Sequence, residues 1–384
     1  EILSGASEGI TVITVGAARI DNLGRIVGSV MTMIGNDRIV NSGTIDGLTA
    51  TSDGNDTVIN TGLIIGDVSL GNGNDWADLR GGRVTGFVSG GEGHDTFLVD
   101  DTPVSLVESQ NNGIDRVISV AQSFVLSDHI EDLVLMSGAR NGIGNAQDNT
   151  ITGNDLANML EGRDGDDALH ALGGDDRVDG GRGDDYIEAG AGADTALGGL
   201  GDDVIRGGDG RDWVYGESGN DSLHGDEGDD FVFGGAGTDV LTGWSGDDVL
   251  NGGAGNDTHV GSTGDDTLTG GMGSDSLIGG PGRDVFRFLT TAESPNDAGR
   301  DVIADFVRGE DLIDLSAIDG SLFAGGNQPL TFIGTAGFSG SGQVRVLMVG
   351  EDAYVQVNTT GLAPSEMMIF VRGSGPLDAS DFIL

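Results

Sequence analysis

The stretch from residue 162 to residue 287 divides into 14 consecutive nonapeptides with no insertion between them. The first unit at full strength is GGRGDDYIE, at residues 180–188. Position 4 is glycine in every unit, and position 8 is apolar in every unit except the one that holds His259. Position 6 is always aspartate: Asp167, Asp176, Asp185, Asp194, Asp203, Asp212, Asp221, Asp230, Asp239, Asp248, Asp257, Asp266, Asp275 and Asp284.

The unit predicts a turn over positions 1–6 and a three-residue strand over positions 7–9. Glycines permit the positive φ angles of a tight turn, and alternate side chains of a strand point to opposite faces. One apolar residue in nine cannot be buried locally, but it can be buried if two units form a coil of 18 residues and the coils stack. The pattern therefore predicts an all-β fold, a parallel β-roll or β-helix solenoid with its position-8 side chains inside.

Stacking brings the position-6 aspartates together. Equivalent aspartates of adjacent coils would lie about 4.8 Å apart, and two such charges repel by roughly 1 kcal/mol even in water. Residues 162–287 carry 28 acidic residues against 7 arginines, within a chain of formal net charge −45. We therefore expect a hard cation between successive turns. Calcium, which takes 6–8 carboxylate and carbonyl oxygens, suits these turns better than magnesium does.

The unit resembles the RTX (repeats-in-toxin) calcium-binding nonapeptide, G-G-x-G-x-D-x-U-x, in which U is a large apolar residue. Residues 252–257 (GGAGND) and 234–239 (GGAGTD) match it closely. The resemblance implies a parallel β-roll with Ca²⁺ held between turns on the same side. Fourteen units form seven turns on each side, which allows up to about 12 shared sites. Two weaker upstream units carry Asn149 and Asn158 at position 6, where we expect weak or absent calcium binding.

A different repeat occupies the N-terminal region. The motif N-x-G-x-I-x-G recurs with glycines at Gly24, Gly43 and Gly62, and half a coil away stands G-N-D or G-H-D. The period near 19 predicts one solenoid coil per repeat, with one calcium-type turn and one plain turn. Asp56, Asp75 and Asp95 are the candidate ligands at this edge. The alternative is a ladder of asparagine and aspartate turns without metal.

The nonapeptide stops near residue 288, where aromatic and aliphatic residues become denser. Residues 284–288 (DVFRF), 301–306 (DVIADF) and 309–316 (GEDLIDLS) resemble the C-terminal domain of serralysin-type secreted proteases. The final DFIL resembles the uncleaved type I secretion signal of that family. We therefore expect four regions: an N-terminal solenoid at 1–97, an irregular strand-rich spacer at 98–143, the RTX β-roll at 144–287, and a serralysin-like cap with the secretion signal at 288–384.

Composition narrows the possible functions. The net charge of −45 disfavours nucleic acid and anionic membranes as partners. No apolar run reaches the ~18 residues of a membrane span. The absence of cysteine excludes disulfides and thiol chemistry. We find neither the H-E-x-x-H motif of serralysins, nor a G-x-S-x-G elbow, nor the D-P-H-type motif of mannuronan epimerases, so we expect no enzyme activity.

Two functional hypotheses remain. The first is a calcium-dependent secreted structural protein: a surface-layer, matrix, adhesin or filament subunit. The second is the calcium-binding carrier and secretion region of a larger extracellular enzyme, which the start at Glu1 rather than methionine would fit. Both predict an extracellular protein of a Gram-negative bacterium, with calcium and the type I secretion apparatus as partners. Self-assembly and binding of cell-surface polysaccharide stay open. The latter would use Trp76, Trp213 and Trp244, of which Trp213 and Trp244 are expected to face outward.

Overall fold

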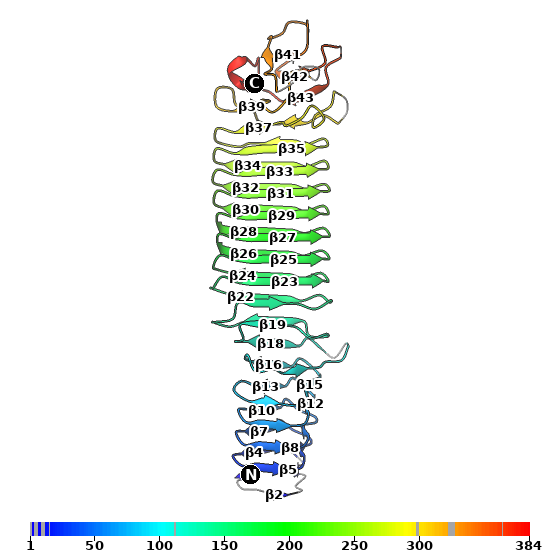
Figure 1. Ribbon diagram of the computed structural model, residues 1–384, viewed down its shortest axis with the longest axis vertical. Coiled ribbons are helices and arrows are strands. Elements are labelled where there is room, and N and C mark those ends of the chain that lie inside the picture. Colours follow the sequence, from blue (N-terminus) through cyan, green and yellow to red (C-terminus); the bar gives the residue numbers. More distant parts are fainter. Residues whose placement is uncertain are drawn as a thin grey trace. The chain divides into compact units, whose positions relative to one another are not determined.

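The computed structural model describes the chain except residues 1, 4–6, 9–11, 15, 111–112, 297–298, 322–326 and 363. The described residues form short β-strands with one 3₁₀ helix, and most strand pairs are parallel and one coil apart (Figure 1). The predicted all-β parallel solenoid is confirmed. The chain divides into two compact units, Glu1–Gly173 and Gly174–Leu384. Among the described residues, no helix has the length and hydropathy needed to cross a bilayer.

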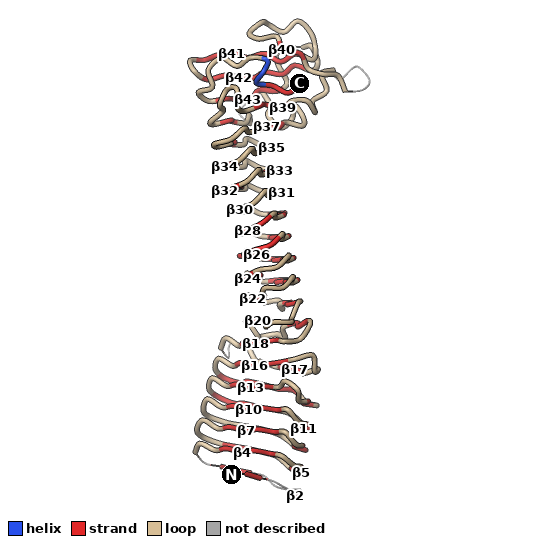
Figure 2. The backbone as a smooth tube through the Cα atoms, turned by 90° about the vertical axis from the view of Figure 1, so that its left-hand side faces the viewer, coloured by secondary structure: helices blue, strands red, loops and turns tan. Residues whose placement is uncertain are grey.

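The first unit starts as a stack of three-stranded coils (Figure 2). Its first sheet contains β1 (Ile2–Leu3), β4 (Arg19–Asn22), β7 (Arg38–Asn41), β10 (Thr57–Asn60), β13 (Trp76–Asp78), β16 (Thr96–Val99), β18 (Arg116–Ser119), β20 (Asp132–Leu135), β22 (Thr150–Asn154) and β24 (Ala168–Leu172). The second contains β2 (Ser7–Glu8), β5 (Arg25–Val27), β8 (Thr44–Asp46), β11 (Leu63–Ile65) and β14 (Arg83–Val84). The third contains β3 (Val12–Thr14), β6 (Val30–Thr32), β9 (Thr49–Ala50), β12 (Val68–Asn72), β15 (Phe87–Glu92) and β17 (Ser105–Leu106). Further on, β19 (Ser123–Val125), β21 (Asn141–Ile143) and β23 (Met159–Asp164) form a fourth sheet.

The coil length in this unit follows the predicted period. Val58 pairs with Ile39 and with Ala77, each 19 residues away. The plain side of the coil bends twice rather than once, which the two-turn expectation missed. The first bend is a buried ladder in which Nδ2 of Asn22 donates to Oδ1 of Asn41 at 2.7 Å, and Asn41 donates to Asn60 in the same way. Side-chain amides thus satisfy each other at this corner.

The second unit starts as a two-sheet roll with an 18-residue coil. One sheet contains β26 (Tyr186–Gly192), β28 (Val204–Gly210), β30 (Ser222–Glu227), β32 (Val240–Ser245), β34 (Thr258–Thr263), β36 (Ser276–Ile278) and β38 (Val302–Ile303). The other contains β25 (Arg177–Arg182), β27 (Thr195–Leu200), β29 (Trp213–Ser218), β31 (Phe231–Ala236), β33 (Val249–Ala254), β35 (Thr267–Met272), β37 (Val285–Arg287), β39 (Leu312–Asp314) and β44 (Phe382–Ile383).

The strands of the regular roll are longer than predicted. Phe231–Ala236, for example, runs from position 7 of one unit through position 3 of the next. The expected turn over positions 1–6 is therefore wrong, because positions 1–3 continue the ladder, as Gly235 pairing with Gly253 shows. The inward-facing prediction for position 8 is confirmed, since these side chains are buried throughout the roll.

The last segment closes both sheets of the second unit. β40 (Thr331–Phe332), β41 (Gln343–Val349), β42 (Asp352–Asn358) and β43 (Met367–Val371) follow the roll, with the 3₁₀ helix η1 at Ala379–Asp381. β41, β42 and β43 are antiparallel, and β43 pairs with β38. The C-terminal strand β44 pairs with β39. Both final strands of the roll thus receive a partner, which reduces exposed sheet edges.

His259 is the one polar residue in the position-8 row of the roll. It is fully buried between Leu241 and Leu277, and neither ring nitrogen has a hydrogen-bond partner. Burial lowers the pKa of His259 to about 3, so the ring is neutral. Because buried unpaired polar atoms are costly, we expect His259→Leu to raise the free energy of unfolding by about 1–3 kcal/mol.

Urea denaturation in saturating calcium measures this change. The reverse substitution, Leu241→His, places the same ring in a neighbouring coil and is expected to shift the midpoint in the opposite direction. A lower midpoint for His259→Leu would show instead that the imidazole stabilises the roll.

Candidate metal centres

The position-6 aspartates of the second unit form two columns, one along each edge of the roll. Each of these residues is buried. From Asp194 to Asp284, the Oδ1 atom of each aspartate accepts a hydrogen bond from the backbone N–H of the aspartate 18 residues earlier, at 2.7–3.0 Å. In the first unit Asp167 accepts in the same way from the N–H of Asn149. One carboxylate oxygen of each residue is thereby fixed.

The second oxygen, Oδ2, is buried without a hydrogen-bond partner in each aspartate from Asp194 to Asp284. Burial is the largest cause of raised pKa values along the columns, and in most cases neighbouring aspartates raise them further. The pKa reaches about 6 for Asp194, Asp221, Asp230 and Asp266, about 7 for Asp203, Asp212, Asp257 and Asp284, and about 8 for Asp248. A column of buried carboxylates is costly when ionised and unpaired. A cation beside Oδ2 removes that cost.

Position-1 glycines keep open the space beside Oδ2. A Cβ atom on Gly234 would lie 2.4 Å from Oδ2 of Asp239 and 2.5 Å from the carbonyl oxygen of Gly252 in the next coil. The same juxtaposition recurs at Gly216, Gly243 and Gly261. A carboxylate oxygen and a carbonyl oxygen therefore converge on a site that any side chain would fill. These are the oxygen types that calcium takes, so the residues present fit this ion.

The columns continue beyond the predicted set of aspartates. Asp301 accepts from the N–H of Asp275 at 2.9 Å, and Asp311 accepts from that of Asp284 at 3.0 Å. Oδ2 of Asp301 also lacks a partner, and burial raises the pKa of Asp301 to about 8. We missed both residues because the nine-residue spacing ends before them. The shorter pattern G-x-D-x-U, present at residues 299–303 and 309–313, would have found them.

Asp56, Asp75 and Asp95 form an equivalent column in the first unit. Oδ1 of each accepts from the N–H of the aspartate one coil earlier, at 2.7–2.8 Å, and each Oδ2 is buried and unpartnered. Burial raises the pKa of Asp75 to about 7. Asp37 and Asp115 belong to the same column but were not among our candidates. Of the two alternatives for this edge, the orphaned oxygens support calcium.

Asn149 and Asn158 differ from the aspartates in a way that fits weak calcium binding. Nδ2 of Asn149 donates to the carbonyl oxygen of Ile130 at 3.2 Å, and Nδ2 of Asn158 donates to that of Ala139 at 3.4 Å. Each amide supplies its own donor where an aspartate leaves an oxygen unpaired. These two turns are therefore satisfied without a cation.

The three tryptophans face solvent, as was predicted for Trp213 and Trp244. Trp76, Trp213 and Trp244 are 39%, 38% and 52% exposed. Trp213 stacks on Phe231 of the next coil, with ring centroids 4.2 Å apart, and Tyr215 stacks on Phe233. These four rings define the outer aromatic cluster: Trp213, Tyr215, Phe231 and Phe233.

Comparison with known proteins gives a family match for the repeat block. The family model of the RTX calcium-binding nonapeptide repeat matches residues 152–258 and 260–286. Among solved structures, the AlgE6R3 subunit of the mannuronan C5-epimerase from Azotobacter vinelandii is 29% identical, covering 38% of this chain and 78% of that chain, with a TM-score of 0.29. The AlgE6R2 subunit is 25% identical, covering 44% of this chain and 91% of that chain, also with a TM-score of 0.29. No curated protein matches the chain.

Proposed function

Because residues 152–286 carry RTX calcium-binding repeats, we propose that the protein is a secreted extracellular structural protein that folds on binding Ca²⁺ after type I secretion. Its role would be that of a surface-layer, matrix, adhesin or filament subunit. The observation that supports this proposal most strongly is the set of position-6 Oδ2 atoms, which are buried and unpartnered along the roll. The roll would therefore be stable only when a cation neutralises these carboxylates.

The position-6 aspartates and glycine-lined carbonyls would hold the calcium, and the ion would supply charge neutralisation between coils. A ligand that binds only the folded state stabilises that state by mass action. At low calcium the carboxylates repel each other, which favours the unfolded chain that a secretion channel requires. At millimolar calcium outside the cell the roll becomes the stable state.

The C-terminal residues fit the same sequence of events. Asp381 and Phe382 are buried in the folded unit, and the N–H of Leu315 donates to the carbonyl oxygen of Ile383 at 2.8 Å. Used as a secretion signal, this segment would be accessible only while the chain is unfolded. Folding outside the cell would then bury it as β44.

A structural role also requires an interaction surface. We assign this surface to the outer aromatic cluster, because its rings stack in register across adjacent coils, with Trp213 exposed and the other three rings half-buried. Negative-stain electron microscopy of the purified chain in millimolar calcium tests this role. We expect ordered filaments or sheets that dissolve on chelation. Monodisperse particles at every calcium concentration would contradict a self-assembling subunit and favour the alternative, a carrier and secretion region of a larger extracellular enzyme.

A further inference from the structure

Three buried carboxylates meet in the first unit outside the regular repeat. Asp95, Glu108 and Asp115 are 0%, 6% and 1% exposed, and one carboxylate oxygen of each lies within 4.8 Å of the others. Asp95 precedes β16 and Asp115 precedes β18, so these two belong to the aspartate column. Glu108 comes from the segment that follows β17, where the repeat is interrupted.

Glu108 occupies the place that position 1 of the nonapeptide takes in the roll, where most units have glycine. The pairing of Val88 with Leu106 puts Glu108 opposite Gly90, just as Gly198 stands opposite Gly180 in the roll. The carboxylate of Glu108 accepts hydrogen bonds from the N–H groups of Gly90 and Gly91. A Cβ atom on Gly90 would lie 2.0 Å from Oδ2 of Asp95. Glu108 thus inserts a third carboxylate beside the orphaned oxygen.

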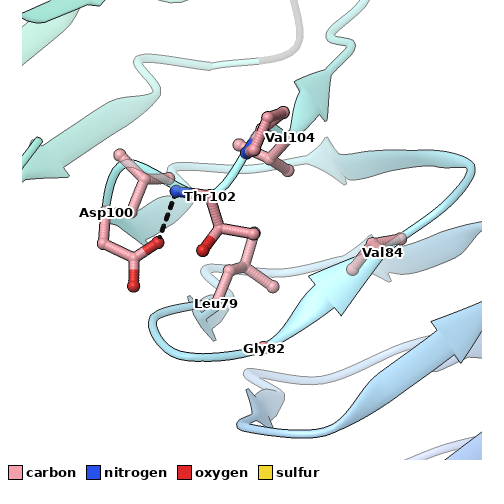
Figure 3. Close-up of a pocket in the computed structure, with 8 residues that line it drawn as sticks. Leu79, Gly82, Val84, Asp100, Thr102 and Val104 are labelled. Atoms are coloured by element: carbon pink, nitrogen blue, oxygen red, sulfur yellow. Dashed lines mark hydrogen bonds between the residues drawn. The ribbon is translucent and has the colours of Figure 1, made fainter.

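The start of the segment that carries Glu108 is anchored to the solenoid. Asp100 accepts from the N–H of Gly81 at 2.7 Å and from that of Thr102 at 2.8 Å. Figure 3 shows the second of these bonds, with Leu79 and Val104 lining a small pocket beside it. The chain departs from the regular coil at Asp100, which these bonds hold in place. It rejoins the sheet at β17, which pairs with β15. The position of Glu108 is therefore set by ordered backbone on its N-terminal side.

Burial raises the pKa of Asp95, although the charge of His94 lowers it in part, and among the described residues no ion pair reaches any of the three carboxylates. The hydrogen bonds to Glu108 and to Oδ1 of Asp95 and Asp115 come from backbone N–H groups, and Oδ2 of Asp95 is buried with no partner. Burial raises the pKa of Asp115 to about 7, and the charges of Glu108 and Asp95 contribute. An oxygen-only set of acidic ligands selects a hard divalent cation.

We propose that Asp95, Glu108 and Asp115 bind one calcium ion at a site that the nonapeptide repeat does not provide. A third carboxylate increases the ligand charge, and calcium affinity rises with ligand charge. This site therefore fills before the sites of the regular roll and fixes residues 100–110 on the solenoid. The proposal concerns the first unit alone and does not depend on the secreted structural role.

The test uses the full chain with Glu108→Gln, which keeps the shape of the side chain and removes its charge. Glu92→Gln is the matched control, because Glu92 lies on the same coil with an exposed side chain. Bound calcium is counted by elemental analysis after dialysis against saturating and limiting calcium. We expect Glu108→Gln to bind one ion fewer than the wild type, with the loss seen first at limiting calcium, and Glu92→Gln to bind the full number. Equal counts for the two variants would overturn the proposal.

A second measurement covers the case in which Glu108→Gln does not fold. Hydrogen exchange of the wild-type chain is followed by mass spectrometry at increasing calcium. Peptides spanning residues 96–119 should gain protection at a calcium concentration at least tenfold below that which protects peptides spanning 221–257. Simultaneous protection of both regions, or equal protection of 96–119 by magnesium alone, would contradict a dedicated calcium site.

Discussion

Chelation of calcium is expected to unfold the nonapeptide roll, with loss of its β signal in circular dichroism. Each site with calcium at 100 times its dissociation constant contributes about 2.7 kcal/mol to folding, so a few sites already equal the 5–15 kcal/mol that stabilises a typical domain. Removing the ions also leaves the position-6 carboxylates buried and mutually repelling. The loss should be reversed by calcium and not by equimolar magnesium, and an unchanged β signal after chelation would contradict it.

Lowering the pH tests independently whether repulsion between the position-6 carboxylates unfolds the calcium-free roll. The folded-state pKa values of the column aspartates lie at about 6 to 8, above the ordinary value of 3.8. Groups with a raised folded-state pKa take up protons on folding, so the calcium-free roll gains stability as pH falls from 8 towards 5. We therefore expect the chelated chain to recover β signal near pH 5. A calcium-free chain that loses structure on acidification over this range would show that carboxylate repulsion is not what unfolds it.

The second large effect is expected for Gly255→Ala, at position 4 of its unit. A Cβ atom there would lie 1.3 Å from the carbonyl oxygen of Gly237 in the preceding coil, and the residue has φ of 153°. Backbone cannot yield at this contact without separating two coils and their ladder. We expect a loss of more than about 4 kcal/mol in the free energy of unfolding, at the upper end for single substitutions.

Urea denaturation in saturating calcium measures this loss. Gly337→Ala is the matched control, since its Cβ would meet nothing within 4 Å and its φ is not in the positive region; a change within about 0.5 kcal/mol is expected. Solenoid contacts connect nearest neighbours, so hydrogen exchange should increase most in the coils beside Gly255. Equal stability of the two variants would mean that the close approach of the coils is not required.

Strict periodicity is what made the roll predictable from sequence. An 18-residue coil puts every position-6 aspartate one strand spacing from the next, so burial of position 8 and the alignment of Asp230 with Asp248 follow from the spacing alone. The same spacing does not show how far a strand extends. Position 1 faces inward but is usually glycine, so no apolar side chain in the sequence indicates that the strand continues there. The six-residue strands were therefore missed.

The features that escaped prediction lie where the period changes. The coil offset is 20 residues between Phe97 and Val117 and 16 between Val117 and Leu133. Glu108 lies beside Asp95 because β17, which follows an irregular segment, pairs in register with β15. No regular spacing in the sequence predicts this pairing. Asp301 likewise follows a longer loop, 26 residues after Asp275 rather than 18.

The central claim is that the position-6 carboxylates are calcium ligands. The most direct test counts bound calcium per chain by equilibrium dialysis with elemental analysis, for the wild type and for Asp230→Ala. The account predicts about 12 ions for the regular repeats of the wild type and a loss of one or two for the variant, because Asp230 lies between Asp212 and Asp248 in its column. A folded wild-type chain that binds no calcium, or a variant that binds as many ions as the wild type, would contradict it.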